Sequence, residues 1–148
     1  MKLEDFENQY KLLGIDNLYC NTYSNMGRKV LETNPKIKAL LERHEGATFE
    51  NGLIRIHNAG SFYFWTGLPF EFFKRYRGKA YVFAYDWMGR QYAVLGENII
   101  LMLDPATAEV FELKVSLEEF FNVDLSQGKE DLLEQSKFLE SLTYYLVS

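Results

Sequence analysis

The side chains best suited to metal binding or nucleophilic catalysis are few and widely spaced. His44 and His57 are the only histidines, and Cys20 is the only cysteine. Zinc sites combine such residues at short, regular spacings, and neither those spacings nor an HExxH pattern occurs. A GxSxG nucleophile elbow is also absent, and a lone cysteine is more often a small buried hydrophobe than a catalytic thiol. We therefore predict no metal site and no catalytic constellation.

Glycine-rich phosphate loops are missing from the sequence as well. Neither GxGxxG nor GxxxxGK[ST] is present, and the glycines of the central region, Gly60, Gly67 and Gly78, are too far apart to form one loop. Because these loops are the usual cradle for nucleotide phosphates, we predict that the chain uses no nucleotide cofactor, and we expect no cofactor of any other kind.

Asp86 is the best candidate for a carboxylate with perturbed acidity, because it ends an apolar run and stands beside Trp87. In one hypothesis it would serve a small enzyme with an aromatic pocket. An aspartate at the end of a strand, however, usually accepts backbone hydrogen bonds in the turn that follows. Arg90, four residues further on, could pair with it across that turn. We expect this structural role for both side chains.

Each of two aromatic segments could either bind a partner or have a purely structural role. Residues 73–79 interleave basic and aromatic side chains, a pattern that can bind single-stranded nucleic acid but that a solvated helix end also explains. Residues 61–65 read Ser-Phe-Tyr-Phe-Trp, and alternate side chains of an extended run face opposite ways. Tyr63 and Trp65 would be strong interface anchors if they were exposed, whereas the same run could instead fill the core.

Length and composition indicate a globular chain that needs no covalent or metal support. With 148 residues, of which 47% are hydrophobic and 16% aromatic, residues 1–148 are expected to form a single domain. One cysteine excludes an internal disulfide. The N-terminus carries acids where a secretion signal needs basic residues, and no apolar stretch is long enough to span a bilayer. We expect a cytoplasmic protein without membrane contact.

Charge is distributed unevenly along the chain. The net charge is −5, yet residues 96–148 contain eleven acidic and three basic side chains, a local excess of −8. Such asymmetry can steer a charged partner, and its sign disfavours DNA or RNA as the ligand of this region. Glu130 and Glu134, at the start of the last predicted helix, could face a basic protein partner or could simply form its solvated side.

Hydrophobic periodicity predicts helices at both ends and strands between them. Residues 2–13 place Leu3, Phe6, Tyr10 and Leu13 on one helical face, and Asn34-Pro35 starts a second helix that ends at Gly46. Residues 116–121 and 129–147 predict two closing helices, the first with a capping-box pattern and the second with a stripe of leucines. The stripe consists of Leu132, Leu139, Leu142 and Leu146.

The strand signals lie in the middle of the chain. Asn51-Gly52 predicts a hairpin between residues 47–50 and 53–57. Four further runs, residues 80–86, 91–95, 98–103 and 109–115, are joined by short connectors, which implies an antiparallel meander. The sequence therefore predicts an α+β domain with a central antiparallel sheet of five to six strands, flanked by N- and C-terminal helices.

The order of several short segments resembles a known group of families. These segments are residues 40–46, 51–57, 83–94, 101–111 and 116–121. Together they are similar to the SUKH superfamily and to the related GAD-like immunity proteins of type VI secretion systems. The resemblance covers roughly residues 35–121 and implies a bacterial immunity protein that binds and neutralises a polymorphic toxin, many of which are nucleases. It implies no fixed catalytic residues.

We therefore predict a non-catalytic protein-binding domain that neutralises its cognate toxin by covering the toxin's active site. The alternative is a regulatory or scaffolding module, like the branch of these families that is linked to cell-wall synthesis control, with a cellular protein as partner. The predicted partner-binding residues are Tyr63, Trp65, Asp86, Trp87, Arg90, Glu130 and Glu134.

Overall fold

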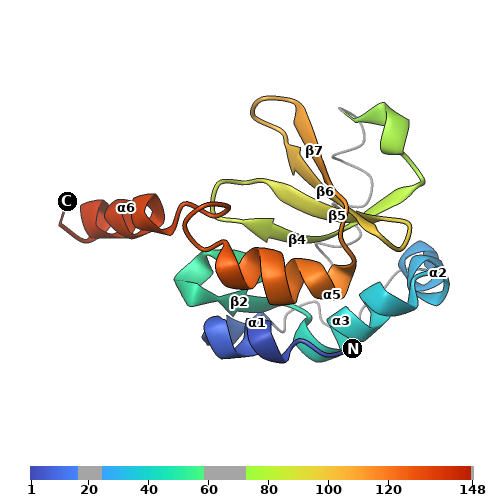
Figure 1. Ribbon diagram of the computed structural model, residues 1–148, viewed down its shortest axis with the longest axis horizontal. Helices are drawn as coiled ribbons and strands as arrows, with labels where there is room; N and C mark the ends of the chain where they lie inside the picture. Colours follow the sequence, from blue (N-terminus) through green and yellow to red (C-terminus); the bar gives the residue numbers. More distant parts are fainter. Residues whose placement is uncertain (17–24, 59–72, 148) are drawn as a thin grey trace.

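The computed structural model describes residues 1–16, 25–58 and 73–147 (Figure 1). Cys20, Tyr63 and Trp65 lie outside the described residues, so the two interpretations of the 61–65 run stay predictions. The helices are α1 (Glu4–Gln9), α2 (Asn25–Thr33), α3 (Pro35–His44), η1 (Glu50–Gly52), η3 (Lys74–Tyr76), α5 (Leu117–Glu119), η4 (Phe120–Leu125) and α6 (Gln135–Val147). The strands are β1 (Leu12–Ile15), β2 (Ala47–Phe49), β3 (Ile54–Ile56), β4 (Ala80–Asp86), β5 (Gln91–Leu95), β6 (Ile99–Asp104) and β7 (Glu109–Leu113).

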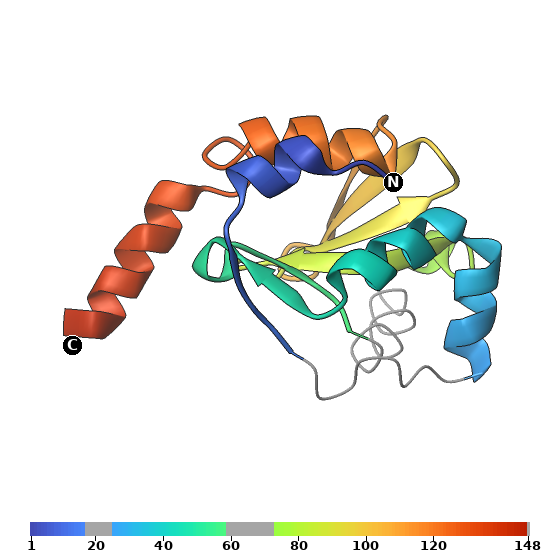
Figure 2. The same ribbon diagram turned by 90° about the horizontal axis from the view of Figure 1, so that it is seen from below.

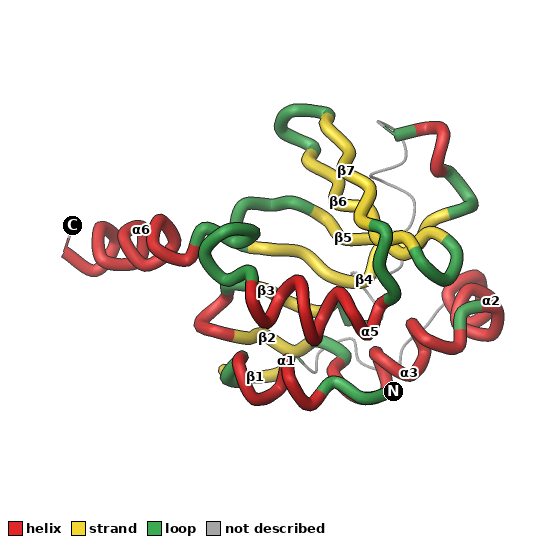
Figure 3. The backbone as a smooth tube through the Cα atoms, viewed as in Figure 1, coloured by secondary structure: helices red, strands yellow, loops and turns green. Residues whose placement is uncertain are grey.

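The strands of the described regions form one antiparallel sheet in the order β1-β2-β3-β4-β5-β6-β7 (Figure 3). The α+β class and the meander are confirmed, but the sheet has seven strands instead of the predicted five or six. The additional strand is β1, which the sequence placed at the end of a helix over residues 2–13. The helix ends at Gln9 because the following residues pair with the hairpin, where Glu50 N–H donates to the Lys11 carbonyl over 2.8 Å.

The Asn-Gly hairpin is confirmed, although its connection is longer than a two-residue turn. Asn51 and Gly52 have the expected positive φ, at 58° and 108°, and Glu50 adds a third at 49°. Strands β2 and β3 pair on either side, with Phe49 opposite Ile54. The larger loop leaves Leu53 free to turn inward, where it is fully buried.

Both faces of the sheet are covered, and each has its own apolar cluster. On β5 and β6 the alternation is strict: Tyr92, Ile100 and Met102 join the large cluster, while Ala93 and Leu101 join a smaller one with Tyr76 of η3. The large cluster also takes residues from α1, α3, α5 and η4. Burial on both faces explains why these strands read as continuous apolar runs. Figure 2 shows α1 and the α5–η4 helix lying side by side, and the Phe6 and Phe121 rings meet there at 4.9 Å between centroids.

Helix α6 projects from one end of the body (Figures 1 and 2). It begins at Gln135, six residues later than the sequence predicted, because residues 129–133 form turns. The predicted leucine stripe is wrong at Leu139, whose side chain is 48% exposed. Phe138 takes the buried position instead, since the described part of α6 meets the body mainly through its first turns.

Candidate partner-binding surface

The segment after the sheet folds into a helix that changes type within its first turns. Ser116 is the N-cap of α5, and its Oγ accepts a hydrogen bond from the Glu119 N–H over 3.2 Å, which confirms the predicted cap. The chain then continues as η4, a π-helix. Phe120 and Phe121 are fully buried at its start. π-Helical turns are rare and frequently occur at functional sites. The surface around η4 is therefore a candidate binding site.

Two side chains connect η4 to α1 and to the residues that flank α1. Asn122 accepts a hydrogen bond from the Phe6 N–H over 3.2 Å and donates to the Lys2 carbonyl over 2.8 Å. The Tyr10 hydroxyl donates to the Leu125 carbonyl over 2.5 Å. Burial raises the pKa of Tyr10, so the phenol stays protonated as that donor. The π-helix is therefore held in place from its inner side, while its outer side remains open.

A groove runs along the outer side of η4. It has a volume of about 360 Å³ and lies between the end of β7, the π-helix and the turns that precede α6. We name it the η4 groove. Val123 projects into it and is 46% exposed. The lining residues are Leu113, Val123, Asp124, Gln127, Gly128, Asp131 and Leu132.

The η4 groove combines an apolar floor with two carboxylates. Leu113, Val123 and Leu132 supply the apolar side chains, and Asp124 and Asp131 supply the charge. Partial burial and the nearby charge of Glu119 raise the pKa of Asp124, so the ionised carboxylate lacks full stabilisation in the free protein. A cation placed beside Asp124 would restore that stabilisation. The arrangement suits a ligand that offers both apolar and positively charged groups.

Gly128 sets the shape of the groove floor. Its N–H donates to the Leu125 carbonyl, and its own carbonyl accepts hydrogen bonds from the N–H groups of Leu132 and Leu133. A Cβ at this position would lie 2.2 Å from the Asp124 carbonyl oxygen and 3.0 Å from the Leu132 Cβ. Glycine is therefore required here by close backbone approach.

We expect Gly128→Ala to lower the free energy of unfolding by about 1–3 kcal/mol, as overpacking against a backbone atom does. The measurement is chemical denaturation. Gly14→Ala is the matched control, because within the described residues no atom other than those of its chain neighbours lies within 4 Å of its Cβ position. It should change stability by less than about 0.5 kcal/mol. Equal effects of the two substitutions would contradict the packing argument for Gly128.

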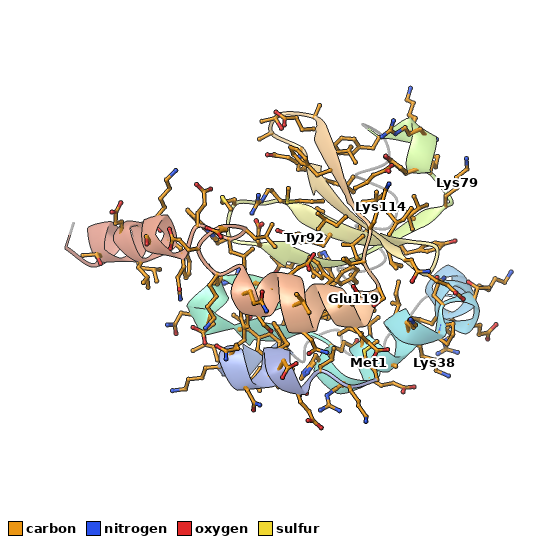
Figure 4. The ribbon with its side chains drawn as sticks, viewed as in Figure 1. Met1, Lys38, Lys79, Tyr92, Lys114 and Glu119 are labelled. Atoms are coloured by element: carbon orange, nitrogen blue, oxygen red, sulfur yellow. The ribbon has the colours of Figure 1, made fainter. Side chains whose placement is uncertain are left out.

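Asp86 lies at the end of β4, and its side chain is completely buried in a hydrogen-bond network. Its Oδ1 accepts from the backbone N–H groups of Met88 and Arg90, over 2.9 and 3.1 Å. Its Oδ2 accepts from Arg90 Nε over 2.8 Å and from the Tyr92 hydroxyl over 2.7 Å. Figure 4 shows Tyr92 inside the body of the molecule. The turn-capping role predicted for Asp86, with Arg90 as its partner, is confirmed.

The same β4–β5 turn holds the chain that leads into α6. Arg90 Nη2 donates to the Leu132 carbonyl, and Trp87 Nε1 donates to the Leu133 carbonyl over 2.6 Å. The Trp87 ring also packs against Phe138, with 5.4 Å between the ring centroids. We call Asp86, Trp87 and Arg90 the β4–β5 latch. Because Leu132 also lines the η4 groove, the latch fixes one wall of the groove and the origin of α6 together.

Glu130 and Glu134, the two glutamates predicted to bind a partner, lie beside the latch and have different roles. Glu130 Oε2 accepts hydrogen bonds from the N–H and the hydroxyl of Ser136, over 3.0 and 2.8 Å, at the start of α6. Glu134 pairs with Lys137 over 2.9 Å on an exposed surface. Glu134 also has a positive φ of 50°, which marks the sharp turn into the helix. Glu130 is thus a structural cap, whereas the carboxylate of Glu134 is presented outward.

Comparisons with protein-family models, with curated proteins and with solved structures found no match.

Five of the predicted partner-binding residues lie in the described part of the chain, and the structure brings them together at the base of α6. They are Asp86, Trp87, Arg90, Glu130 and Glu134. Of these, Asp86 is too deeply buried to touch a partner, and only 14% of the Arg90 side chain is exposed. The sequence analysis did not predict the groove residues Val123, Asp124 and Asp131 as binding residues. It placed the acidic binding residues in the last predicted helix instead. The available signal was the short spacing of acids around a glycine in the 123–131 stretch.

Both histidines contact polar side chains of the fold. Nε2 of His57, which is buried, lies 2.9 Å from the Gln91 Oε1, and His44 lies 3.3 Å from Glu7. Within the described residues, no cluster of three or more His, Cys, Asp or Glu side chains could hold a metal ion. In the same regions no helix is both long and apolar enough to cross a membrane.

Burial lowers the pKa of His57 from 6.5 to about 4. In the unfolded chain the His57 imidazole therefore becomes protonated below pH 6.5, whereas in the folded chain it stays neutral until the pH is near 4. We expect the unfolding free energy of the wild type, relative to His57→Gln, to fall by up to about 1.4 kcal/mol per pH unit across this window. Above it the difference is constant. Denaturant titrations at several pH values measure this, and parallel pH profiles would contradict the assignment.

The basic cluster at residues 73–79 is organised around a buried ring. Tyr76 is 5% exposed, its hydroxyl donates to Glu112 Oε1 over 2.8 Å, and the Arg75 guanidinium covers its ring at 4.5 Å. Because the Tyr76 ring is buried and covered by Arg75, it is not available to stack on a nucleic acid base. An open hollow of about 420 Å³ lies beside it, lined by Lys74, Ala108 and Val110 among others.

Proposed function

We propose that this chain is a non-catalytic protein-binding domain that acts as a bacterial immunity protein, neutralising a cognate toxin by covering its active site. The observation that carries the proposal is the η4 groove, in which an apolar floor is flanked by Asp124 and Asp131. The order of short segments that resembles the SUKH and GAD-like immunity proteins supplies the toxin as the class of partner.

Charge complementarity defines the partner segment. The region from residue 113 to residue 140 contains seven acidic and three basic side chains. A toxin segment with Lys or Arg beside Leu or Phe would satisfy the carboxylates and cover the apolar floor. Toxins that cleave nucleic acids carry basic substrate surfaces of this kind.

The rigid support of the groove favours recognition over chemistry. Asn122 and Tyr10 fix the π-helix, and the β4–β5 latch fixes the wall at Leu132. A surface that is already ordered loses less conformational entropy when a partner binds. Asp86, the best enzymatic candidate in the sequence, has its carboxylate oxygens occupied by four hydrogen bonds.

The proposal is tested by co-expressing the chain with the product of the neighbouring gene as the candidate toxin. We expect the wild type to restore growth and to form a complex with the purified toxin. Val123→Arg should abolish both, because it places a long cation on the groove floor. Thr107→Arg, in the β6–β7 turn, is the control and should protect like the wild type.

Growth arrest despite expression of the folded wild type, with no complex, would exclude toxin immunity and favour a module with a cellular partner. Protection by Val123→Arg equal to that of the wild type would retain the function but remove the η4 groove from it. Turnover of a small compound that a single polar substitution abolishes would replace the whole proposal with an enzyme.

A further inference from the structure

Among the strands of the described residues, β1 is an edge of the sheet, and it carries no charged side chain. It occupies one end of the strand order and reads Leu-Leu-Gly-Ile. All of its residues are exposed, with Leu12 at 46%, Leu13 at 61% and Ile15 at 50%. An edge strand presents a row of backbone donors and acceptors that another strand can complete. Figure 3 shows β1 at the rim of the molecule, at the end of the sheet opposite β7.

The opposite edge is protected in the usual way. Strand β7 carries Glu109 and Glu112, and both are exposed. Two β7 strands that paired with one another would bring these carboxylates close together, which disfavours association. The β1 edge has no charged side chain between Leu12 and Ile15 and exposes large aliphatic side chains. Its protection against pairing is limited to its short length and a register shift between Leu12 and Gly14, so the two ends of the same sheet are built differently.

The charges that flank β1 favour a second copy of the same strand. Lys11 precedes it and Asp16 follows it. When two copies pair antiparallel about a two-fold axis, the Lys11 end of each strand lies beside the Asp16 end of the other. Self-pairing thus opposes no like charges within the strand and places opposite charges at both ends. The Asp16 carboxylate at that end also accepts a hydrogen bond from Asn58 Nδ2 over 3.2 Å within its own chain. A parallel arrangement would bring like charges together instead.

We propose that this protein forms a two-fold homodimer in which two β1 strands pair antiparallel and join the two sheets into one. The pairing completes the edge hydrogen bonds and covers Leu12, Leu13 and Ile15. The η4 groove begins at the end of β7, the opposite edge of the sheet. Each dimer therefore presents two open grooves, and dimerisation does not compete with the proposed binding of a partner.

The test is the molar mass of the purified full chain by light scattering or sedimentation over a dilution series. We expect twice the 17.4 kDa of one chain at high concentration, and dissociation on dilution. Leu13→Lys should give a monomer at every concentration, because it brings like charges together near the axis. Phe111→Lys is the matched control, since Phe111 lies on β7 and is 47% exposed, and it should remain dimeric.

A second measurement does not depend on any variant. Amide hydrogen exchange of residues 12–15 in the wild type should slow as the protein concentration rises, while exchange in β7 should not change. A wild type that is monomeric at all concentrations overturns the proposal, and so does dissociation by Phe111→Lys to the same extent as by Leu13→Lys. If Leu13→Lys instead prevents toxin binding by a monomeric wild type, the edge accepts a partner strand, which also overturns the homodimer.

Discussion

Asp86→Ala is expected to lower the free energy of unfolding by about 3–5 kcal/mol, because it leaves the buried Arg90 guanidinium without its charge partner. The Arg90 side chain is only 14% exposed, so water cannot replace the lost carboxylate fully. The Tyr92 hydroxyl and two backbone N–H groups lose their acceptor at the same time. Denaturant unfolding followed by circular dichroism measures the loss.

Asp104→Ala is the matched control for this prediction. Asp104 also ends a strand and also accepts a hydrogen bond within its turn, from the Ala106 N–H over 3.0 Å, but that site is exposed. Its removal should cost about 1 kcal/mol or less. A loss at Asp86 no greater than that at Asp104 would show that the buried network is not what holds the turn.

Reversing the charge of both groove carboxylates is expected to slow association with the toxin by about tenfold or more at low salt, because complementary charge mainly accelerates encounter. The variant is Asp124→Lys with Asp131→Lys. Glu130 is unsuitable for this experiment, although it lies in the same region, because it holds the N–H and hydroxyl of Ser136 and its loss would disturb α6. Stopped-flow or surface-based kinetics give the association rate.

The control for charge reversal is Glu97→Lys with Glu109→Lys, which changes the net charge by the same amount at exposed positions outside the groove. It should alter the association rate far less. The difference between the two double variants should shrink as salt is added, because screening weakens interactions between exposed charges. An association rate that is independent of both salt and groove charge would remove electrostatic steering from the proposal.

The amino-acid sequence by itself determined the parts of the fold that depend on neighbours in the chain. The four strands from β4 to β7, the positive φ at Asn51 and the Ser116 cap follow from local patterns, and the structure confirms each. The turn-capping role of Asp86 was predictable for the same reason, because its partners in the turn are at most four residues away.

Tertiary structure decided the features that depend on pairing across long sequence separations. Residues 12–15 are a strand and not a helix end because β2 offers them backbone partners more than thirty positions away. The latch works through the Leu132 and Leu133 carbonyls, whose positions no pattern around Asp86 reveals. The η4 groove exists because Tyr10 and Asn122 draw distant segments together and Gly128 lets the backbone approach closely. Local propensity is weaker than these long-range contacts, so such positions are fixed only when the whole chain has folded.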